Sequence, residues 1–308
     1  MPTITDIAKA LGITAGTVSR ALRSDPRVKE TTRLDVLAKA QSLGYVPHRA
    51  AQHLARGKSD TVWILLGDLE WPQERQFASA CNRLLWQRGY RSLIVLHDHN
   101  EAKLKMLLQD LASGSADGAM ILPTVGMKPT QLYKDLQVPL LFVDRWVKGL
   151  KFPVVTSNNF QGAKTLLRRA LEQGPAFSTV ITTREARNEV EQDRHRGLSE
   201  ACKECGITLH YSPPSIPVGA PLAIYGNTQE DIVEGLRQGG LNQCVSILTW
   251  DQWLGSPRPA QAVYYARQDF EAMSNSATEI LLAWITTNNI AHGKTETPIL
   301  DILSIQRS

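Results

Sequence analysis

From residue 61 onward the chain alternates short apolar runs with stretches of helical periodicity. An apolar run of four or five residues between amphipathic helical segments is typical of a strand in a parallel sheet covered on both faces. The pattern occurs twice, with a seam near residues 155–159, so we expect two doubly wound α/β halves. Two open sheets with a cleft between them most often bind a small ligand by closing on it. The runs are residues 62–66, 92–96, 118–122, 139–143, 178–182, 222–225 and 245–249.

The first 22 residues have a different pattern, in which two short amphipathic helices are separated by a turn. The first helix follows a Thr3 cap and ends at Gly12, and Thr14 caps the second. This helix-turn-helix lets the N-terminus of the second helix approach base edges and phosphates, although surface hairpins without a ligand share the pattern. The outer face of the second helix carries Ala15, Gly16, Thr17, Ser19, Arg20 and Arg23.

A third helix is predicted over residues 28–43, with Leu34, Leu37, Ala40 and Leu43 turned toward the core of a three-helix headpiece. Residues 1–60 hold ten Lys and Arg against five Asp and Glu, so the net charge of +4 is concentrated there. A basic headpiece suits a phosphate-bearing partner. The stretch after Tyr45 predicts a short hinge helix that is not stable by itself.

Composition and the absence of common motifs narrow the possible classes of protein. With 43% hydrophobic and 21% charged residues, no apolar run of membrane-spanning length and no signal peptide, we expect a cytoplasmic protein without membrane contact. No GxGxxG, P-loop, GxSxG or HExxH motif occurs, which argues against an enzyme. Cys202 and Cys205 form a CxxC without a second pair or a nearby histidine, so we expect no metal and no cofactor.

The order of these parts resembles the lactose-repressor/galactose-repressor (LacI/GalR) family of bacterial transcription regulators, over essentially the whole chain. The most specific matches are TITDIAKALGITAGTVSRAL, where the family has TI-DVA--AGVS--TVSR-L, and YVPHRAAQHL, where it has Y-PN--A--L. The closing SIQRS is similar to the family's last strand. The resemblance implies an all-α helix-turn-helix headpiece and a periplasmic-binding-protein-like α/β domain of two doubly wound parallel-sheet subdomains.

The resemblance also implies the domain boundaries. They are a headpiece over residues 1–46, a hinge helix and linker over 47–60, and an effector-binding and dimerisation domain over 61–308. The N-subdomain of that domain would comprise about 61–158 and 267–291, and the C-subdomain about 159–266 and 292–308.

For DNA, the resemblance implies a homodimer on a pseudo-palindromic operator. Ala15, Gly16 and Arg20 would face bases, Thr3, Thr17, Ser19 and Arg27 would hold phosphates, and Tyr45 would begin the hinge, with Ala51 in the minor groove and Leu54 as a wedge between base pairs. Because Gly16 has no side chain, discrimination between bases must depend on Arg20, on apolar contact from Ala15 and on DNA shape.

For the effector, the resemblance implies a site at the carboxyl ends of strands in both halves. Carboxylates, an amide and a guanidinium suit hydroxyls or an anionic group, and an indole face can stack on a sugar ring. A small molecule, such as a sugar or a related metabolite, is therefore expected. The chain lacks about one family helix between Cys205 and Tyr225. The implied effector residues are Asp144, Arg194, Asn227 and Asp251, and Trp250 joins them as a candidate because it falls just past a strand end, where an indole can stack on a sugar.

Three functions are open from the sequence. The first is a dimeric, effector-controlled DNA-binding regulator, expected to repress transcription and to be associated with the nucleoid. The second is a constitutive DNA-binding regulator that has lost its effector response, which the missing helix favours. The third is an enzyme or solute-binding protein built on the paired sheets.

Overall fold

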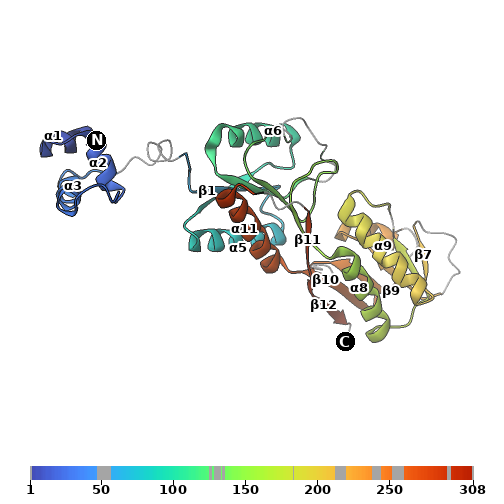
Figure 1. Ribbon diagram of the computed structural model, residues 1–308. Helices are drawn as coiled ribbons and strands as arrows, with labels where there is room; N and C mark the ends of the chain where they lie inside the picture. Colours follow the sequence, from blue (N-terminus) through green and yellow to red (C-terminus); the bar gives the residue numbers. More distant parts are fainter. Residues whose placement is uncertain are drawn as a thin grey trace. The chain divides into compact units, whose positions relative to one another are not determined.

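The computed structural model of this 308-residue chain describes residues 2–46, 57–124, 127, 133, 136–182, 184–211, 220–237, 244–251, 260–289 and 293–306. The chain divides into two compact units, residues 1–59 and 60–308, which we call the headpiece and the body. In Figure 1 the headpiece is a cluster of helices, and the body contains sheets with helices packed on them.

The headpiece helices begin and end at residues that the sequence marks. The Thr3 side chain and Asp6 form a capping box at the start of the first helix, which Gly12 ends with a left-handed φ of 65°. The Thr14 side chain caps the second helix. Both predicted helices of the helix-turn-helix are thus confirmed. The described helices are α1 (Ile4–Leu11), α2 (Ala15–Leu22) and α3 (Glu30–Ser42).

The headpiece core uses a different face of α3 from the predicted one. Val36 and Ala40 are buried, whereas Leu34, Leu37 and Leu43 expose 56%, 46% and 39% of their surfaces. The prediction was right for Ala40 and wrong for the three leucines. Apolar residues lie on two faces of α3, and the face with smaller side chains packs against the other two helices. The other buried core residues are Ile7, Ala8, Val18 and Ala21.

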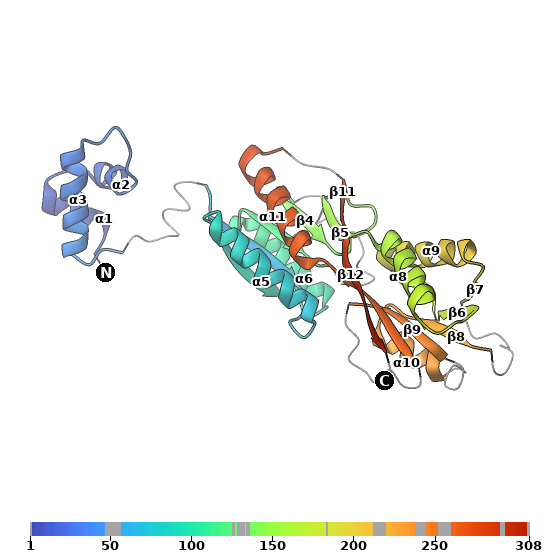
Figure 2. The same cartoon turned by 90° about the horizontal axis from the view of Figure 1, so that it is seen from below.

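The first subdomain of the body is a parallel sheet in the order β11-β5-β4-β3-β1-β2. One face packs against α5 and α11, which lie together, and the other packs against α6 (Figures 1 and 2). Its central strands are nearly all apolar because helices cover both faces. The elements are β1 (Thr61–Leu66), α5 (Pro72–Gln87), β2 (Arg91–Leu96), α6 (Glu101–Asp110), the π turn η1 (Leu111–Ser115), β3 (Gly118–Ile121), β4 (Leu140–Val143), β5 (Val154–Ser157), α11 (Phe270–Thr287) and β11 (Lys294–Thr297).

The second subdomain has the sheet order β12-β10-β9-β8-β6-β7, with β12 antiparallel to β10. Helices α8 and α9 pack side by side on one face, where Gly197 of α9 allows close approach: a Cβ there would lie 2.1 Å from the carbonyl oxygen of Phe160. The elements are α8 (Asn159–Gln173), β6 (Thr179–Thr182), α9 (Glu189–Glu204), β7 (Thr208–His210), β8 (Leu222–Tyr225), α10 (Gln229–Gly235), β9 (Cys244–Trp250), β10 (Ala262–Gln268) and β12 (Ile299–Gln306).

The chain crosses between the two sheets after β5, after β10 and after β11. The predicted return of α11 to the first half is confirmed, since its buried Phe270, Met273 and Leu281 belong to the first core. The predicted boundaries need two corrections. Strand β11 pairs with β5 in the first sheet although residues 292–308 were assigned to the second, and Arg267 and Gln268 complete β10 in the second sheet. The cause is that α11 ends beside the first sheet, whose edge strand β5 still has a free side for β11.

None of the helices in these described ranges is long and apolar enough to cross a membrane. Several predicted features lie outside the described residues. They are the hinge helix with Ala51 and Leu54, most of the helical segment 132–136 and the Pro-rich stretch 212–219.

Candidate DNA interface and effector site

The N-terminus of α2 presents small, exposed residues. Ala15 and Gly16 are exposed. The N–H of Thr17 donates to Thr14 Oγ1 over 3.1 Å, and the two hydroxyl oxygens are 2.9 Å apart. No acidic residue lies in the first turn. The positive end of the helix dipole is therefore accessible to an anion such as a DNA phosphate.

The two arginines predicted to contact DNA have partners within the headpiece. Arg20 Nε donates to the carbonyl of Gly16 over 3.2 Å, so its guanidinium lies along the outer side of α2. Arg27 forks onto Asp25, with Nε–Oδ1 and Nη2–Oδ2 distances of 3.0 and 2.7 Å, and its hydrogen bonds hold the pKa of Asp25 well below the usual range. A guanidinium has five N–H donors, so each arginine keeps donors for a base or a phosphate.

The other predicted DNA residues have structural contacts of their own. The Thr3 hydroxyl accepts from the Asp6 N–H in the capping box and donates to Asp6 Oδ2 over 2.8 Å. The N–H of Tyr45 donates to the carbonyl of Ala40 over 2.8 Å, and the tyrosine packs against the headpiece core. Ser19 is half-buried on α2. Their contacts with DNA, and those of Ala51 and Leu54, stay predictions.

In the body, Asp144 and Asp251 occupy equivalent turns of the two subdomains. Asp144 follows β4 with φ 63°, and Asp251 follows β9 with φ 62°; aspartate is among the few residues that adopt this left-handed conformation. Each N–H donates over 2.7 or 2.8 Å to the neighbouring strand, from Asp144 to Val155 and from Asp251 to Ala266. The two carboxyl-end aspartates therefore have the same backbone support.

The side chains of these aspartates differ. Gln268 Nε2 donates to both oxygens of Asp251, over 3.2 and 3.1 Å. Burial raises the pKa of Asp251; Arg194 opposes the rise and the Asp144 carboxylate adds to it. Asp144 accepts from Arg145 Nε over 3.1 Å at Oδ2, while its buried Oδ1 has no hydrogen-bond partner among the described residues.

Arg194 lies on the face of Trp250, with its guanidinium carbon 3.8 Å from the ring centroid. Its Nε donates to Asn159 Oδ1 over 2.8 Å, and Arg194 is only 6% exposed. A cation on an indole face in a dry site is well stabilised. The structure thus brings together the predicted residues Arg194, Trp250 and Asp251, with Asp144 close enough to act on the Asp251 carboxyl.

Asn227 is connected to this group only indirectly, through the side chain of Tyr225. Trp250 Nε1 donates to the Tyr225 hydroxyl over 3.0 Å, and that hydroxyl donates to Asn227 Oδ1 over 3.1 Å. Asn227 Nδ2 lies 3.3 Å from His195 Nε2, which accepts when the imidazole is neutral. Burial lowers the pKa of His195, which favours that neutral form. Asn227 is therefore connected to Trp250 through Tyr225 and does not touch Arg194 through any of these bonds.

The first subdomain contributes groups that the sequence analysis missed. His97 follows β2 and is fully buried; its Nε2 lies 3.0 Å from the carbonyl of Leu122, and its Nδ1 has no partner among the described residues. Buried Glu74 accepts the N–H of Gly67 over 2.9 Å. Burial raises the pKa of Glu74 and lowers that of His97, while the charge of Arg145 acts against the rise in Glu74 and adds to the fall in His97.

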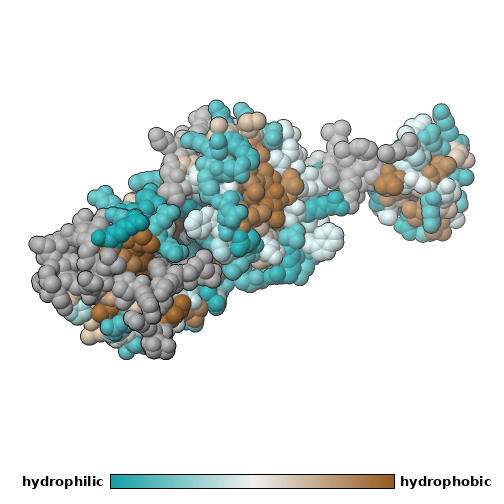
Figure 3. All heavy atoms as spheres, turned by 180° about the vertical axis from the view of Figure 1, so that it is seen from behind, coloured by the Kyte–Doolittle hydropathy of each residue, from teal (hydrophilic) through white to brown (hydrophobic). Residues whose placement is uncertain are grey.

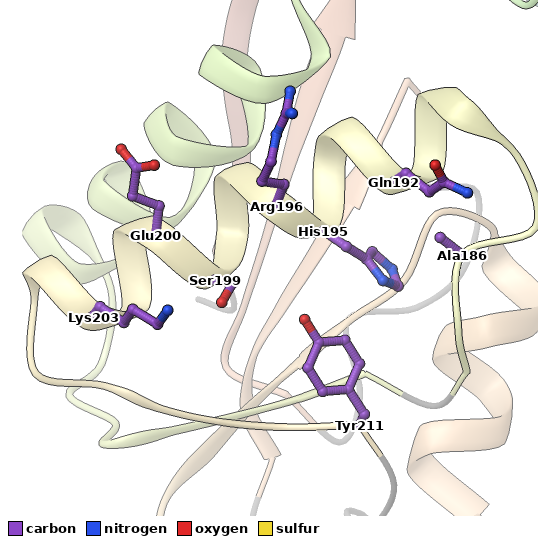
Figure 4. A pocket seen from close by; sticks show the side chains of 8 residues that line it. All are labelled: Ala186, Gln192, His195, Arg196, Ser199, Glu200, Lys203 and Tyr211. Atoms are coloured by element: carbon purple, nitrogen blue, oxygen red, sulfur yellow. The ribbon is translucent and has the colours of Figure 1, made fainter.

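A pocket of about 410 Å³ lies along α9 (Figure 4). In Figure 4 His195 points from α9 toward Tyr211, and the two ring centroids are 5.9 Å apart. His195 therefore separates this pocket from Asn227. The lining residues are Ala186, Gln192, His195, Arg196, Ser199, Glu200, Lys203 and Tyr211.

The missed residues had weak sequence signals. Asn159, Tyr225, His195 and Gln268 become partners of the predicted residues only when segments distant in sequence fold together. Position was the one available signal, since Tyr225 and Gln268 end strands and Asn159 begins a helix directly after one. In the part of the chain that the structure describes, no group of three or more His, Cys, Asp or Glu side chains is arranged to hold a metal.

Comparison with known proteins gives matches to both parts of the chain. Residues 3–48 match the family model "Bacterial regulatory proteins, lacI family". The "Ribose operon repressor" of Bacillus subtilis is 30% identical over 207 residues, which cover 67% of this chain and 62% of that protein. The "HTH-type transcriptional regulator GalR" of Escherichia coli is 27% identical over 215 residues, which cover 68% and 61%. The chain thus spans about three fifths of the length of these curated relatives.

Solved structures share the fold. The lac repressor dimer bound to operator and the anti-inducer ONPF superposes with a TM-score of 0.71 at 17% identity, covering 98% of this chain and 97% of that one. The Cra regulator of Pseudomonas putida in complex with fructose 1-phosphate gives a TM-score of 0.59 at 20% identity, covering 81% and 99%. The fold is accordingly a helix-turn-helix headpiece with a body of two parallel-sheet subdomains. The headpiece is a lacI-family domain, and the chain as a whole is similar to regulators of that family.

Proposed function

We propose that this protein is a dimeric, sequence-specific DNA-binding transcriptional regulator that represses its targets, and whose operator affinity is set by a small sugar-like effector held between the two subdomains. The observation that carries the proposal is the convergence of Arg194, Trp250, Asp251 and Asp144 at the carboxyl ends of strands from both sheets. This edge is where ligands bind in open α/β sheets. A headpiece with an accessible helix N-terminus precedes it in the same chain.

The chemistry of the site favours a ligand with several hydroxyl groups. The buried Trp250 indole carries the Arg194 guanidinium on one face and so holds it in the site, the guanidinium offers donors, and the Asp144 and Asp251 carboxylates offer acceptors. Hydroxyls both donate and accept, so one polyol can satisfy all of these groups. Titration calorimetry with pentoses, hexoses, disaccharides, sugar phosphates and nucleobases tests this assignment. We expect a sugar to bind.

A second copy of this chain is the expected partner. Trp86 of α5 exposes 71% of its surface, and Leu93 and Ile94 of the edge strand β2 expose 47% and 42%. Figure 3 shows apolar side chains gathered on this subdomain. Exposed apolar side chains at an unpaired strand edge favour association. Sedimentation of the full chain should give a dimer, and Leu93→Lys should shift it toward the monomer.

DNA binding is tested by fluorescence anisotropy with fragments from the source genome. We expect tight binding to a pseudo-palindromic site, with an affinity that falls as salt rises. Arg20→Ala should reduce the preference for that site over other sequences, whereas Arg27→Ala should lower the affinity for all DNA sequences by a similar factor. Binding that is independent of both salt and sequence would overturn the regulator assignment.

A constitutive regulator is the second candidate. Arg194 has an aromatic partner and a hydrogen bond, and Asp251 is held by Gln268, so protein side chains already bind both charged groups in this half of the site. The sequence that connects β7 to β8 is also shorter than the family pattern by about one helix. If no compound binds and operator affinity never changes, the constitutive role replaces the effector-controlled one.

A further inference from the structure

A line of buried hydrogen bonds connects the two subdomains beside the effector site. The Thr156 hydroxyl donates to the carbonyl of Asp144 over 2.7 Å. Asn159 Nδ2 donates to Thr156 Oγ1 over 3.2 Å and to the carbonyl of Ser157 over 2.9 Å. Arg194 Nε donates to Asn159 Oδ1 over 2.8 Å. The line begins in the first sheet and ends on α9 of the second subdomain.

These groups are shielded from solvent. Thr156, Asn159 and Arg194 are 0%, 2% and 6% exposed. Water therefore has little access to replace a lost partner, and each broken bond leaves a buried polar group unsatisfied. Loss of the hydrogen bond to Arg194 costs the most, because a guanidinium without its partner keeps its charge in a site with little water.

We propose that Asn159 is a positioning residue of the effector site, which fixes the Arg194 guanidinium against Trp250 and connects it to the turn that carries Asp144. This inference rests on the proposed effector-binding function. Asn159 acts through Arg194 and Thr156, and the ligand touches the residues at the two ends of the line. An asparagine amide can accept from the arginine while donating to the hydroxyl and the carbonyl, which neither aspartate nor leucine can do.

The place of Asn159 in the chain adds a second role. It is the first residue of α8, directly after the crossover from β5. Hinge residues of this kind absorb the rotation when two subdomains close on a ligand. A ligand that moves Arg194 will therefore also displace Thr156 and Asp144 through these hydrogen bonds. Contacts made in one half of the site thus change the position of groups in the other half.

Three substitutions separate the hydrogen bond between Asn159 and Arg194 from the hydrogen bond between Asn159 and Thr156. Asn159→Asp keeps the acceptor for Arg194 and loses the donor to Thr156. Asn159→Leu loses both, and Thr156→Val removes the hydroxyl while leaving Asn159 and Arg194 in place. Asn158→Asp is the matched control, because Asn158 Oδ1 only caps α8 by accepting from Gln161, which an aspartate also does.

The first readout needs no ligand. NMR of protein labelled with ¹⁵N-arginine reports the exchange of the Arg194 Nε–H, assigned by its loss in Arg194→Lys. We expect slow exchange in the wild type, Asn159→Asp, Thr156→Val and the control, and fast exchange in Asn159→Leu. An Arg194 Nε–H that exchanges slowly in Asn159→Leu would overturn the positioning role. If Asn159→Leu does not fold, Asn159→Asp decides the matter, because aspartate keeps the acceptor for Arg194. Fast exchange of the Arg194 Nε–H in Asn159→Asp would then overturn the positioning role.

The second readout is calorimetry with whichever sugar of the panel binds the wild type. Loss of a hydrogen bond to a charged group predicts at least about 10-fold weaker binding for Asn159→Leu, a smaller loss for Thr156→Val and no change for the control. Unchanged affinity in both Thr156→Val and Asn159→Asp would contradict the connection between the halves. A panel without any binder would contradict the proposed function alone, and the NMR comparison would still decide the role of Asn159.

Discussion

The two halves of the proposed effector site have the same backbone conformation at their aspartates and different side-chain hydrogen bonds. Asp144 and Asp251 both follow a strand with a left-handed φ, and both donate their N–H to the next strand. Gln268 holds both oxygens of Asp251, whereas Asp144 has one buried oxygen without a partner among the described residues. One fold has thus been used twice, and only the second copy is fully hydrogen-bonded at its aspartate.

This difference suggests a division of labour. In the second half, protein contacts fix the charged group: Arg194 lies on Trp250 and donates to Asn159. Among the described residues, the first half keeps an unpaired oxygen on its aspartate, Asp144 Oδ1, and another unpaired acceptor at His97 Nδ1, whereas the unpaired acceptor of the second half, Gln268 Oε1, is not on the aspartate. Preorganised groups bind at lower entropic cost, while buried unpaired acceptors favour the closed state that brings them a donor. Ligand binding to the second half would then be followed by closure of the first.

The largest expected effect comes from disturbing the second half. Gly197→Ala places a Cβ 2.1 Å from the carbonyl oxygen of Phe160, so α9 must separate from α8 and carry Arg194 away from Asn159. We expect the free energy of unfolding of the body to fall by about 3 kcal/mol in urea titrations. Gly16→Ala is the control: Gly16 is helical, a Cβ there would make only ordinary contacts at 3.8 Å from Thr14 Oγ1 and 3.9 Å from Arg20 Nη2, and alanine should stabilise the headpiece by about 0.5–1 kcal/mol. A harmless Gly197→Ala would mean that the α8–α9 contact adjusts freely.

Paired substitutions at the two aspartates test the comparison itself. Burial raises the pKa of Asp251, so its ionised form is disfavoured in the folded protein. Asp251→Asn should therefore raise the free energy of unfolding at pH 7 by about 1 kcal/mol, and it should weaken binding of the effector. Asp144→Asn removes the negative charge from the ion pair with Arg145 and should give no such gain. Thermal and urea unfolding of both variants measures this. Equal stability changes would show that the two halves are not different in the way described.

The smallest expected effect concerns the buried histidines, one in each subdomain. Burial lowers the pKa of His97 and of His195 below the ordinary value of 6.5, so the unfolded chain takes up protons first as pH falls. The stability due to each neutral histidine is therefore present above about pH 6.5 and is lost as pH falls toward the folded pKa, by at most about 1.4 kcal/mol for each pH unit. The difference in unfolding free energy between wild type and His97→Gln, taken at pH 7.5 and 5.5, isolates this effect. A difference that does not change with pH would contradict it.

Much of this architecture could be predicted because local rules decide it. Threonine caps, Gly12 and the apolar runs of the parallel strands each depend on nearby residues, and all of these predictions were confirmed. The face of α3 could not be chosen locally, since two apolar stripes compete and the space between three helices decides. The edge strand β11 was misassigned because its strand signal does not say which sheet it joins.

The candidate site divides in the same way. Asp144, Arg194, Trp250 and Asp251 were predictable from motifs and from the ends of strands. Their partners were not, because Asn159 and Arg194 are 35 residues apart in sequence and Gln268 reaches Asp251 from a neighbouring strand. Hydrogen bonds of this kind follow from the packing of α8 on α9 and of β10 beside β9, which the sequence pattern does not encode position by position.

The most direct test of effector control is operator binding measured by fluorescence anisotropy, with and without the sugar that binds, for the wild type and for Arg194→Met. Methionine keeps apolar contact with Trp250 and removes the guanidinium. We predict that the sugar changes the operator Kd of the wild type by about 10-fold or more and leaves that of Arg194→Met unchanged, while both proteins bind the operator equally well without sugar. An operator Kd that ignores the sugar in the wild type, or responds equally in the variant, would contradict control of DNA binding through this site.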